Sequence, residues 1–394
     1  MIKMAFQFLT GEANLGTVNL PSGSNSRIPM KFSMDIDGRW IYCNYPERIT
    51  SDSMFGDSDK GNVWLNQKTV SAGEAQIFYS HYNQYKSNIH YGIQIFNPNK
   101  TSVTITPLNC GHGQGNGSDS GRINVNAASW TRFFNGASDC GTTTAKTVAS
   151  NGSFWILDKV IPQGYGFSGN LRFRTSGTVI VTVYAFLDRY KISGAGSQYQ
   201  YDEASVQYSG YGAGYFLTAA EITIKASDVL NNGGKFFQTC YSEYPKPVKG
   251  EENPMEVNGK AQSDMVPIHI AGTSEIAGPD EPRPRHNVGN WCVQYYIPVR
   301  FENDTNRDVV FKGYIQPGED NKNENFYILS SGSNNTVYQR ISSINEEKYK
   351  DKRTWHWTNH TVPAHTTSAV QICQFILGTN SSKNVNHIWK VENK

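Results

Sequence analysis

The sequence has 394 residues, of which only 18% are charged, and its 36 Lys and Arg residues nearly balance its 34 Asp and Glu residues. Dedicated nucleic-acid-binding proteins are usually strongly basic, and disordered chains are poor in aromatic residues, so the near-neutral charge and the 12% aromatic content exclude both classes. No apolar run approaches the roughly 18 residues of a membrane-spanning helix, so we expect no transmembrane segment.

The N-terminus shows no signal peptide. Its apolar stretch, residues 5–9, is shorter than the roughly 7–15 residues of a signal core, and no small-residue cleavage site follows. Two export routes stay open: removal of a signal that preceded this sequence, or release without one, for example by lysis.

Strand patterns dominate the rest of the chain. Branched and aromatic residues alternate with polar ones over residues 89–96, and the turn at 97–100 leads to a second such run at 103–106, which predicts a half-buried hairpin. Further strands are predicted at residues 76–79, 154–157, 171–174, 178–186, 222–225, 266–271, 293–301, 309–315 and 370–377. Helical periodicity is nearly absent, and only residues 227–230 and 341–349 are expected to form a helical turn or two.

Many short strands separated by turns predict an all-β fold of two tandem antiparallel β-sandwiches, either jelly-roll or immunoglobulin-like. We expect an N-terminal sandwich over residues 1–190 and a C-terminal sandwich over residues 216–394. Residues 191–215 are rich in Gly, Tyr and Ser, so they form the expected linker.

A faint internal repeat suggests that the two sandwiches are duplicates. Residues 93–108 align with residues 299–314, and each copy contains a strand, a turn that begins with Asn97 or Asn303, and a second strand. A later match pairs two segments that begin with aromatic residues and end with a proline, residues 154–162 and 355–363.

Two stretches carry a resemblance to known proteins. The segments HYNQYKSNIHYGIQIFNPNKTSVTIT (residues 81–106) and HNVGNWCVQYYIPVRFEN (residues 286–303) resemble predicted β-domains of surface and secreted proteins from endospore-forming Gram-positive bacteria. Some of those proteins are labelled copper-amine-oxidase-like because of a separate stalk module, which is not seen in this sequence. The resemblance implies an exterior, cell-wall, spore or environmental role and carries no inference about chemistry.

The six cysteines are too sparse for a disulfide-built scaffold, and none has CxxC or zinc-finger spacing. Cys110 and Cys140 both lie in Gly/Ser/Asn-rich segments that are predicted to be loops, so they form the candidate disulfide; free buried thiols are the alternative. The Gly-rich segment 110–117 also contains His112, but a neighbouring Cys and His on a flexible loop lack the order of a catalytic pair. We expect a mobile surface or interface loop there.

Acidic residues near the start of the chain form the best candidate metal site. Asp57 and Asp59 alternate with a serine ahead of Gly61, and Asp52 lies close by in the sequence; this pattern can wrap Ca²⁺, although the full EF-hand spacing is missing. A solvated turn is the alternative, and no other cofactor is expected.

Histidines cluster at His356, His360 and His365. No Glu follows His356 to complete an HExxH motif, and Pro363 opposes a helix. Ordinary strand and loop histidines are therefore favoured over a transition-metal site.

Aromatic residues are the candidate ligand-binding or interface residues, because exposed rings can stack on sugars or anchor a protein interface. This set comprises Trp291, Trp355, Trp357, Tyr295, Tyr296, Tyr208, Tyr211 and Tyr215.

The sequence favours a non-enzymatic structural protein that self-assembles into a layer, fibre or crystal outside the cell or around a spore. Low charge, an amide- and hydroxyl-rich surface and abundant Tyr favour association between copies over solubility. The alternative is an adhesin, or a carbohydrate-binding or toxin-component module, that holds a glycan on exposed Trp or Tyr. A hydrolase with dispersed carboxylates is a third hypothesis. No nucleic-acid partner is expected.

Overall fold

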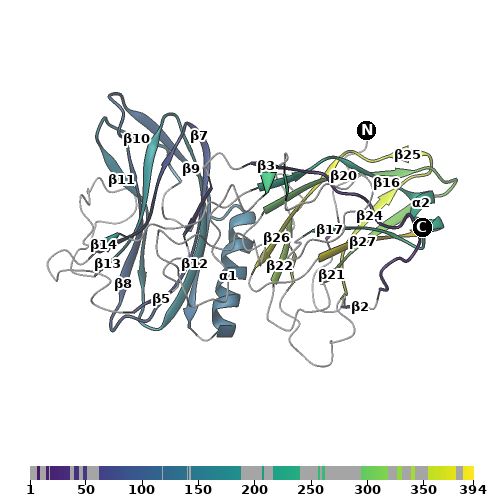
Figure 1. The fold of residues 1–394 in the computed structure, drawn as a ribbon, viewed down its shortest axis with the longest axis horizontal. Helices are drawn as coiled ribbons and strands as arrows, with labels where there is room; N and C mark the ends of the chain where they lie inside the picture. The colour runs from purple at the N-terminus through teal and green to yellow at the C-terminus, as the bar shows by residue number, and fades with distance from the viewer. Residues whose placement is uncertain are drawn as a thin grey trace.

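The computed structural model describes residues 7–8, 15–16, 18–35, 40–43, 48–50, 62–117, 119–139, 141, 143–187, 206–207, 216–239, 256–257, 260–261, 294–317, 326–330, 339–341, 354–378 and 385–394. Strands dominate these residues and form two β-sandwiches, with the helix α1 (Asp119–Phe134) between them (Figure 1). The predicted fold class, two antiparallel β-sandwiches, is confirmed. No helix in the described part of the chain is long and apolar enough to cross a membrane.

The first sandwich is a jelly roll. Its strands are β4 (Trp40–Cys43), β5 (Arg48–Ile49), β6 (Asn62–Val70), β7 (Gly73–Asn83), β8 (Ile89–Phe96), β9 (Val103–Asn116), β10 (Lys146–Val148), β11 (Ser153–Ile161), β12 (Tyr165–Thr175), β13 (Val179–Leu187) and β14 (Val206–Gln207). The β8 sheet has the order β11-β8-β13-β6-β14, and the β12 sheet has the order β10-β9-β12-β7-β4, with β5 also paired to β7. The orders β11-β8-β13-β6 and β10-β9-β12-β7 are those of a jelly roll, the first of the two predicted alternatives.

The second sandwich is also built from two sheets. Its strands are β1 (Gln7–Phe8), β2 (Leu15–Gly16), β3 (Phe32–Asp35), β15 (Phe216–Ala219), β16 (Ile222–Lys225), β17 (Lys235–Thr239), β20 (Gln294–Asn303), β21 (Val309–Pro317), β22 (Phe326–Ser330), β23 (Gln339–Ile341), β24 (Thr354–Val362), β25 (Thr366–Thr367), β26 (Gln371–Gly378) and β27 (Val385–Asn393). The β21 sheet has the order β1-β24-β21-β27-β17, with β2 also on β24; the β26 sheet has the order β23-β22-β26-β20-β15-β3, with β16 and β25 also on β20. A short helix, α2 (Ala226–Asn231), follows β16, and β18 (Glu256–Val257) pairs with β19 (Lys260–Ala261).

The two sandwiches share one topology. The order β24-β21-β27-β17 repeats β11-β8-β13-β6, and β23-β22-β26-β20 repeats β10-β9-β12-β7. Even the short parallel additions recur, because β15 and β16 run parallel to β20 just as β4 and β5 run parallel to β7. The chain therefore contains two copies of one jelly roll, as the internal repeat suggested.

Local irregularities recur as well. A β-bulge skips Ile156 in β11, and an equivalent bulge skips Trp357 in β24; both extra side chains are buried in their cores. The turn after each of these strands also needs a residue with positive φ, supplied by Gly164 (77°) in the first copy and by His365 (54°) in the second. Such irregular features are conserved within related folds, so their recurrence supports duplication.

A buried asparagine fixes the turn that follows β7 and the turn that follows β20. The amide of Asn83 or Asn303 donates to the carbonyl four residues later and to the carbonyl of Ile161 or Val362, at distances of 2.7–3.0 Å. Its Oδ1 accepts from the N–H two residues later at 3.0 Å in both copies. Asn97 makes the same three types of bond in the turn after β8.

This recurring turn explains an error in the sequence alignment. Because β8 is equivalent to β21, residues 83–96 correspond to residues 303–316, and the predicted match of residues 93–108 with 299–314 is wrong by one turn. The first jelly roll contains the asparagine turn twice in succession, at Asn83 and at Asn97. The sequence match aligned Asn303 with Asn97, whereas its structural equivalent is Asn83. The match of residues 154–162 with 355–363 is confirmed, because both segments are the strand that carries the bulge.

Helix α1 packs against the outer face of the β12 sheet, where glycines of β9 allow a close approach. A Cβ on Gly111 would lie 2.1 Å from the carbonyl oxygen of Ser129, and one on Gly113 would lie 2.7 Å from that of Val125. On the same face, Phe78 stacks on Trp130 with their ring centroids 5.7 Å apart. The prediction of a mobile loop at 110–117 is therefore wrong, since most of this segment is strand, and its glycines create the surface on which the helix lies.

The first residues of the chain belong to the second sandwich. Strands β1 and β2 pair with β24, and β3 pairs with β15, so the predicted N-terminal domain of residues 1–190 is too long at its start. Of the predicted linker 191–215, only residues 206–207 are described, and they form β14 in the first sandwich. The predicted strand 266–271 lies outside the described residues.

Candidate functional site

Exposed sheet edges are the places where jelly rolls can recruit further strands, because an edge strand presents unpaired N–H and C=O groups. In the second sandwich, the N-terminal segment covers the outer edge of β24. Phe8 lies opposite Thr358, and Leu15 lies opposite Trp355, in antiparallel register. This edge is thus completed by residues more than three hundred positions away in the sequence.

The same segment continues to the opposite edge of the β21 sheet. Ile28 N–H donates to the carbonyl of Phe236 at 2.7 Å, and Phe236 N–H donates to the carbonyl of Ser26 at 2.9 Å. This parallel bridge covers the outer edge of β17. The N-terminal segment therefore covers both outer edges of one sheet.

The first sandwich has only one of these two additions among the described residues. Its β6 edge is covered in parallel by β14, with Val206 opposite Val63, just as Arg27 covers β17. Strand β11, the equivalent of β24, pairs with β8 on one side and with no strand of the described chain on the other. Residues 154–157 of β11 are nevertheless 0% exposed, as buried as the covered strand β24, so this edge is not an open acceptor for a further strand. The edges of the β21 sheet, to which the N-terminal segment adds as strands, are the candidate site of a protein that associates through strand addition.

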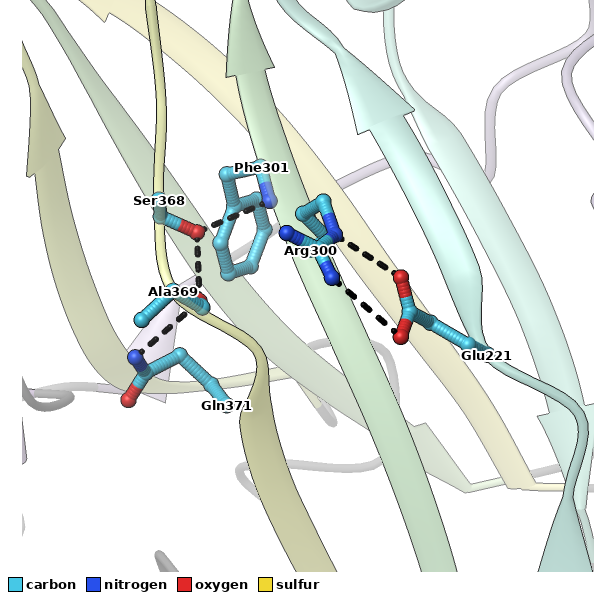
Figure 2. A network of polar contacts seen from close by, with 6 residues as sticks. All are labelled: Glu221, Arg300, Phe301, Ser368, Ala369 and Gln371. Atoms are coloured by element: carbon cyan, nitrogen blue, oxygen red, sulfur yellow. Dashed lines mark hydrogen bonds and ion pairs between the residues drawn. The ribbon is translucent and has the colours of Figure 1, made fainter. Parts of the chain in front are cut away.

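A polar network interrupts the pairing of β20 with β25 and β26 (Figure 2). Phe301 N–H donates to Ser368 Oγ at 3.0 Å, and Ser368 N–H donates back to the Phe301 carbonyl at 2.8 Å. Ser368 Oγ and Gln371 Nε2 both donate to the carbonyl of Ala369, at 2.8 and 3.3 Å. These bonds satisfy backbone groups at the break, so the network has a structural role.

An ion pair lies beside this break. Arg300 donates from Nε to Glu221 Oε1 at 2.8 Å and from Nη2 to Oε2 at 3.4 Å, which lowers the pKa of Glu221 (Figure 2). Both side chains are partly exposed, and ion pairs near the surface contribute little stability. The pair ties the start of β16 to β20 without forming a reactive centre.

A cysteine and a histidine meet inside the first sandwich. Cys43 Sγ lies 3.5 Å from His81 Nε2, and the ring of His81 lies 5.4 Å from that of Tyr91. Both Cys43 and His81 are buried, and burial raises the pKa of the Cys43 thiol to about 12. A nucleophilic cysteine needs a lowered pKa and access to substrate, so this contact is a packing feature of the core.

A second chain of polar contacts leads from this core to the surface. Tyr79 Oη and His112 Nδ1 are 2.8 Å apart, and the His112 backbone N–H donates to Asp139 Oδ2 at 3.0 Å. Burial lowers the pKa of His112 to about 4. Burial opposes ionisation of Asp139, but hydrogen bonds from Arg132 and from the His112 backbone outweigh it and lower the pKa of that carboxyl. These contacts join α1 to β9 through charged and neutral hydrogen bonds.

Three of the eight residues of the predicted aromatic site lie in a core. Trp355, Trp357 and Tyr295 are at most 4% exposed and lie in the core of the second sandwich, so the prediction that they form a ligand or interface surface is wrong. The period of two along β20 and β24 directs them inward. Tyr296 is half-buried and accepts a hydrogen bond from Gln294 Nε2 at 3.1 Å. The remaining candidates, Trp291, Tyr208, Tyr211 and Tyr215, lie outside the described residues.

The three histidines near the end of the chain do not share a site. His356 is half-buried and contacts Asn359 Oδ1 at 2.8 Å, His360 is buried in the sandwich, and His365 is exposed in the turn after β24. Within the described residues, no three His, Cys, Asp or Glu side chains are grouped as metal ligands. The candidate Ca²⁺ ligands Asp52, Asp57 and Asp59 lie outside the described residues.

Cys110 of the candidate disulfide is disulfide-bonded, and Cys140 lies outside the described residues. The Cys110 N–H donates to the carbonyl of Ala137 at 2.6 Å, and Asp139 N–H donates to the carbonyl of Cys110 at 3.0 Å. The segment that follows α1 is thus attached to β9 by backbone bonds beside the disulfide. Cys43 and Cys373 are free, buried thiols.

Comparison with known proteins gives no family. No family model matches the chain, and no curated protein matches it. Among solved structures, the chain is similar to oxalate decarboxylase from Bacillus subtilis at pH 4.6, with 9% sequence identity over 83% of this chain and 73% of that chain and a TM-score of 0.10. It is similar to the formate complex of Lactobacillus farciminis oxalate decarboxylase, with 7% identity over 83% of each chain and a TM-score of 0.11. It is also similar to procruciferin, an 11S globulin from Brassica napus, with 7% identity over 83% of this chain and 86% of that chain and a TM-score of 0.10. Likenesses at such TM-scores carry no argument about function.

Proposed function

We propose that this chain is a non-enzymatic structural protein that self-assembles into an extracellular or spore-associated layer, fibre or crystal. One observation carries the proposal: the chain completes both outer edges of the β21 sheet by adding a segment that is remote in the sequence as further strands. Strand addition at sheet edges gives binding energy through backbone hydrogen bonds and does not require a pocket.

The surface composition supports association between copies. Only 18% of the residues are charged and the net charge is +2, so electrostatic repulsion between copies is weak. A protein that must stay monomeric at high concentration usually carries a larger net charge.

The disulfide at Cys110 supports the exterior location. Disulfides persist in oxidising surroundings such as the cell surface and are rare in the reducing cytosol. A glycan-binding role is less favoured, because three of the aromatic residues that would serve it, Trp355, Trp357 and Tyr295, are core residues.

Electron microscopy of concentrated, purified protein tests the proposal against this alternative. We expect ordered layers, fibres or crystals that dissolve on dilution, and no binding to a glycan array. Isolated particles of one chain at every concentration, together with specific glycan binding, would contradict the proposal and favour the adhesin alternative.

A further inference from the structure

We propose that strands β1 and β2 exchange between copies of this chain: each copy adds them to the β24 edge of the next copy instead of to its own, which links copies into an open chain. This inference rests on the proposed function and names the contact through which the copies join. The acceptor edge needs no free surface in the monomer, because a copy that donates its two strands leaves its own β24 edge for the strands of another copy.

The two donated strands are joined to β24 at few positions. Each contributes two residues: β1 pairs with Thr358 and Asn359, and β2 pairs with Thr354 and Trp355. On its other side, β24 pairs with β21 over seven residues of that strand. A single backbone hydrogen bond adds only modestly to net stability, so the two short ladders open more easily than the long one.

The chain that follows β2 is attached much more firmly. Gln316 Nε2 donates to the carbonyl of Val18 at 3.2 Å, and Met30 is fully buried in the core of the second sandwich. Strand β3 then pairs with β15. The division between the lightly paired and the firmly attached part falls at Gly16, and glycine has the backbone freedom that a hinge requires. The two strands can therefore leave while the rest of the segment stays in place.

The edge of β24 lacks the features that protect an edge strand from other chains. Proteins usually protect such strands with charged side chains or proline. Strand β24 contains no Lys, Arg, Asp, Glu or Pro, whereas its equivalent β11 contains Asp158 and Lys159. An uncovered β24 would therefore pair with another strand, and the strands that it accepts within one chain are β1 and β2.

The donor is suited to pairing with a strand of another copy. Residues 4–11 contain no charged side chain and no proline, and two of them are phenylalanine. Short neutral stretches that are rich in apolar residues add readily to strands of other chains. Neither β24 nor this stretch carries a like charge that would oppose their pairing, so a second copy offers the same register as the chain itself.

Exchange makes assembly depend on concentration. Residues 7–17 reach at most about 35 Å when extended, so the β24 edge of a neighbour must lie within that distance of Val18. Within one chain the strands are held near their own edge at a high effective concentration, so transfer to another copy requires concentrated protein. Each copy has one donor and one acceptor, and successive donation extends into an open chain if it does not close into a ring.

Disulfide trapping between full-length chains tests the exchange, because Gln7 and Asn359 lie opposite each other. One chain carries Gln7→Cys, the other carries Asn359→Cys and an isotope label, and the mixture is concentrated and oxidised. We expect mass spectrometry to find a disulfide between residues 7 and 359 of unlike chains, at least tenfold more abundant than in the dilute mixture. Each variant alone is the control for the natural cysteines. Absence of this disulfide, or chains with Asn359→Cys that link to each other at residue 359, overturns the inference.

The double variant with Gln7→Cys and Asn359→Cys separates this inference from the proposed function. Oxidation of the dilute double variant locks the strands onto their own edge, so it should stay monomeric at concentrations at which the wild type assembles. Reduction should restore its assembly, with the wild type in the same reductant as the control. A locked chain that assembles as well as the wild type supports self-assembly and overturns the exchange. Disulfides between unlike chains in species of no more than two chains support the β24 site and contradict the open assembly of the proposed function.

Discussion

Replacing Gly111 with Ala should displace helix α1 from the first jelly roll. The added Cβ would lie 2.1 Å from the Ser129 carbonyl oxygen and 2.4 Å from the Phe133 backbone nitrogen. Comfortable contacts between such atoms are about 3.5 Å long, so the helix would have to move by roughly 1 Å. Both contacting atoms belong to the backbone, so no side-chain rotation can relieve the overlap.

The expected cost follows from what the helix buries. Trp130 and Phe133 are fully buried, and a helix that moves away from β9 loosens both. Overpacking a tight site usually costs about 1–3 kcal/mol, and a backbone collision belongs at the upper end of that range. We therefore expect Gly111→Ala to lower the free energy of unfolding by about 3 kcal/mol.

Urea denaturation followed by tryptophan fluorescence measures this loss, and Gly115→Ala is the matched control on the same strand. At Gly115 the nearest atom to a new Cβ is Cγ2 of Val125, at 3.3 Å, which belongs to a side chain that can adjust. We expect the control to stay within about 1 kcal/mol of the wild type. Equal stability of the two variants would refute the argument that Gly111 sets the distance between helix and sheet.

Three further predictions concern the cores. Asn303→Ala should lower the free energy of unfolding by about 3 kcal/mol, because it leaves buried backbone groups without hydrogen-bond partners. The control Asn306→Ala, at an exposed position of the same turn, should change it by less than about 0.5 kcal/mol, and thermal unfolding of both variants is the test. Burial lowers the pKa of His360 to about 4 and that of His387 to about 3, so below pH 6.5 the unfolded chain binds protons that the folded chain does not. We therefore expect the melting temperature to be highest above pH 6.5 and to fall as the pH decreases toward 4. A melting temperature that does not change with pH, in the wild type as in His360→Phe, would contradict this. Cys43 should resist iodoacetamide at pH 8 in the folded protein and react in urea, as mass spectrometry can show; rapid labelling of the folded chain would mean that the thiol is not held in the core.

Strand positions were predictable where alternation and turn residues agree. Residues 89–96 and 222–225 form β8 and β16 with the predicted bounds, because branched residues alternate there between turn formers. Residues 103–106 were predicted as a short strand, but β9 continues to Asn116. Glycine is unfavourable in an isolated strand, and only the close approach of α1 explains its use there.

Helix α1 was missed because its sequence has weak helical propensity. Asn and Ser recur inside it, and both residues compete with the helix by bonding to nearby backbone groups. The spacing of Trp130, Phe133 and Phe134, which are all buried, was the available signal for a packed helical face. Tertiary contacts with β9 and β12 stabilise this segment as a helix, and these contacts cannot be inferred from the sequence of the segment itself.

The candidate site was the least predictable part of the protein. The aromatic residues of β24 stand out in the sequence, but sequence alone does not say which face of a strand is inward when Trp and His alternate along it. The apolar stretch at residues 5–9 is too short for a signal peptide and shows no strand pattern, yet Gln7 and Phe8 form a strand on β24. Pairing across more than three hundred residues leaves no local trace in the sequence.

Sedimentation velocity over a wide concentration range tests the central claim most directly. We expect the purified chain to sediment as a monomer when dilute and as progressively larger species when concentrated, in low and in high salt, because hydrogen bonds between backbones are not screened by ions. A single monomeric species at every concentration and in every buffer would contradict the claim that this protein is built to assemble.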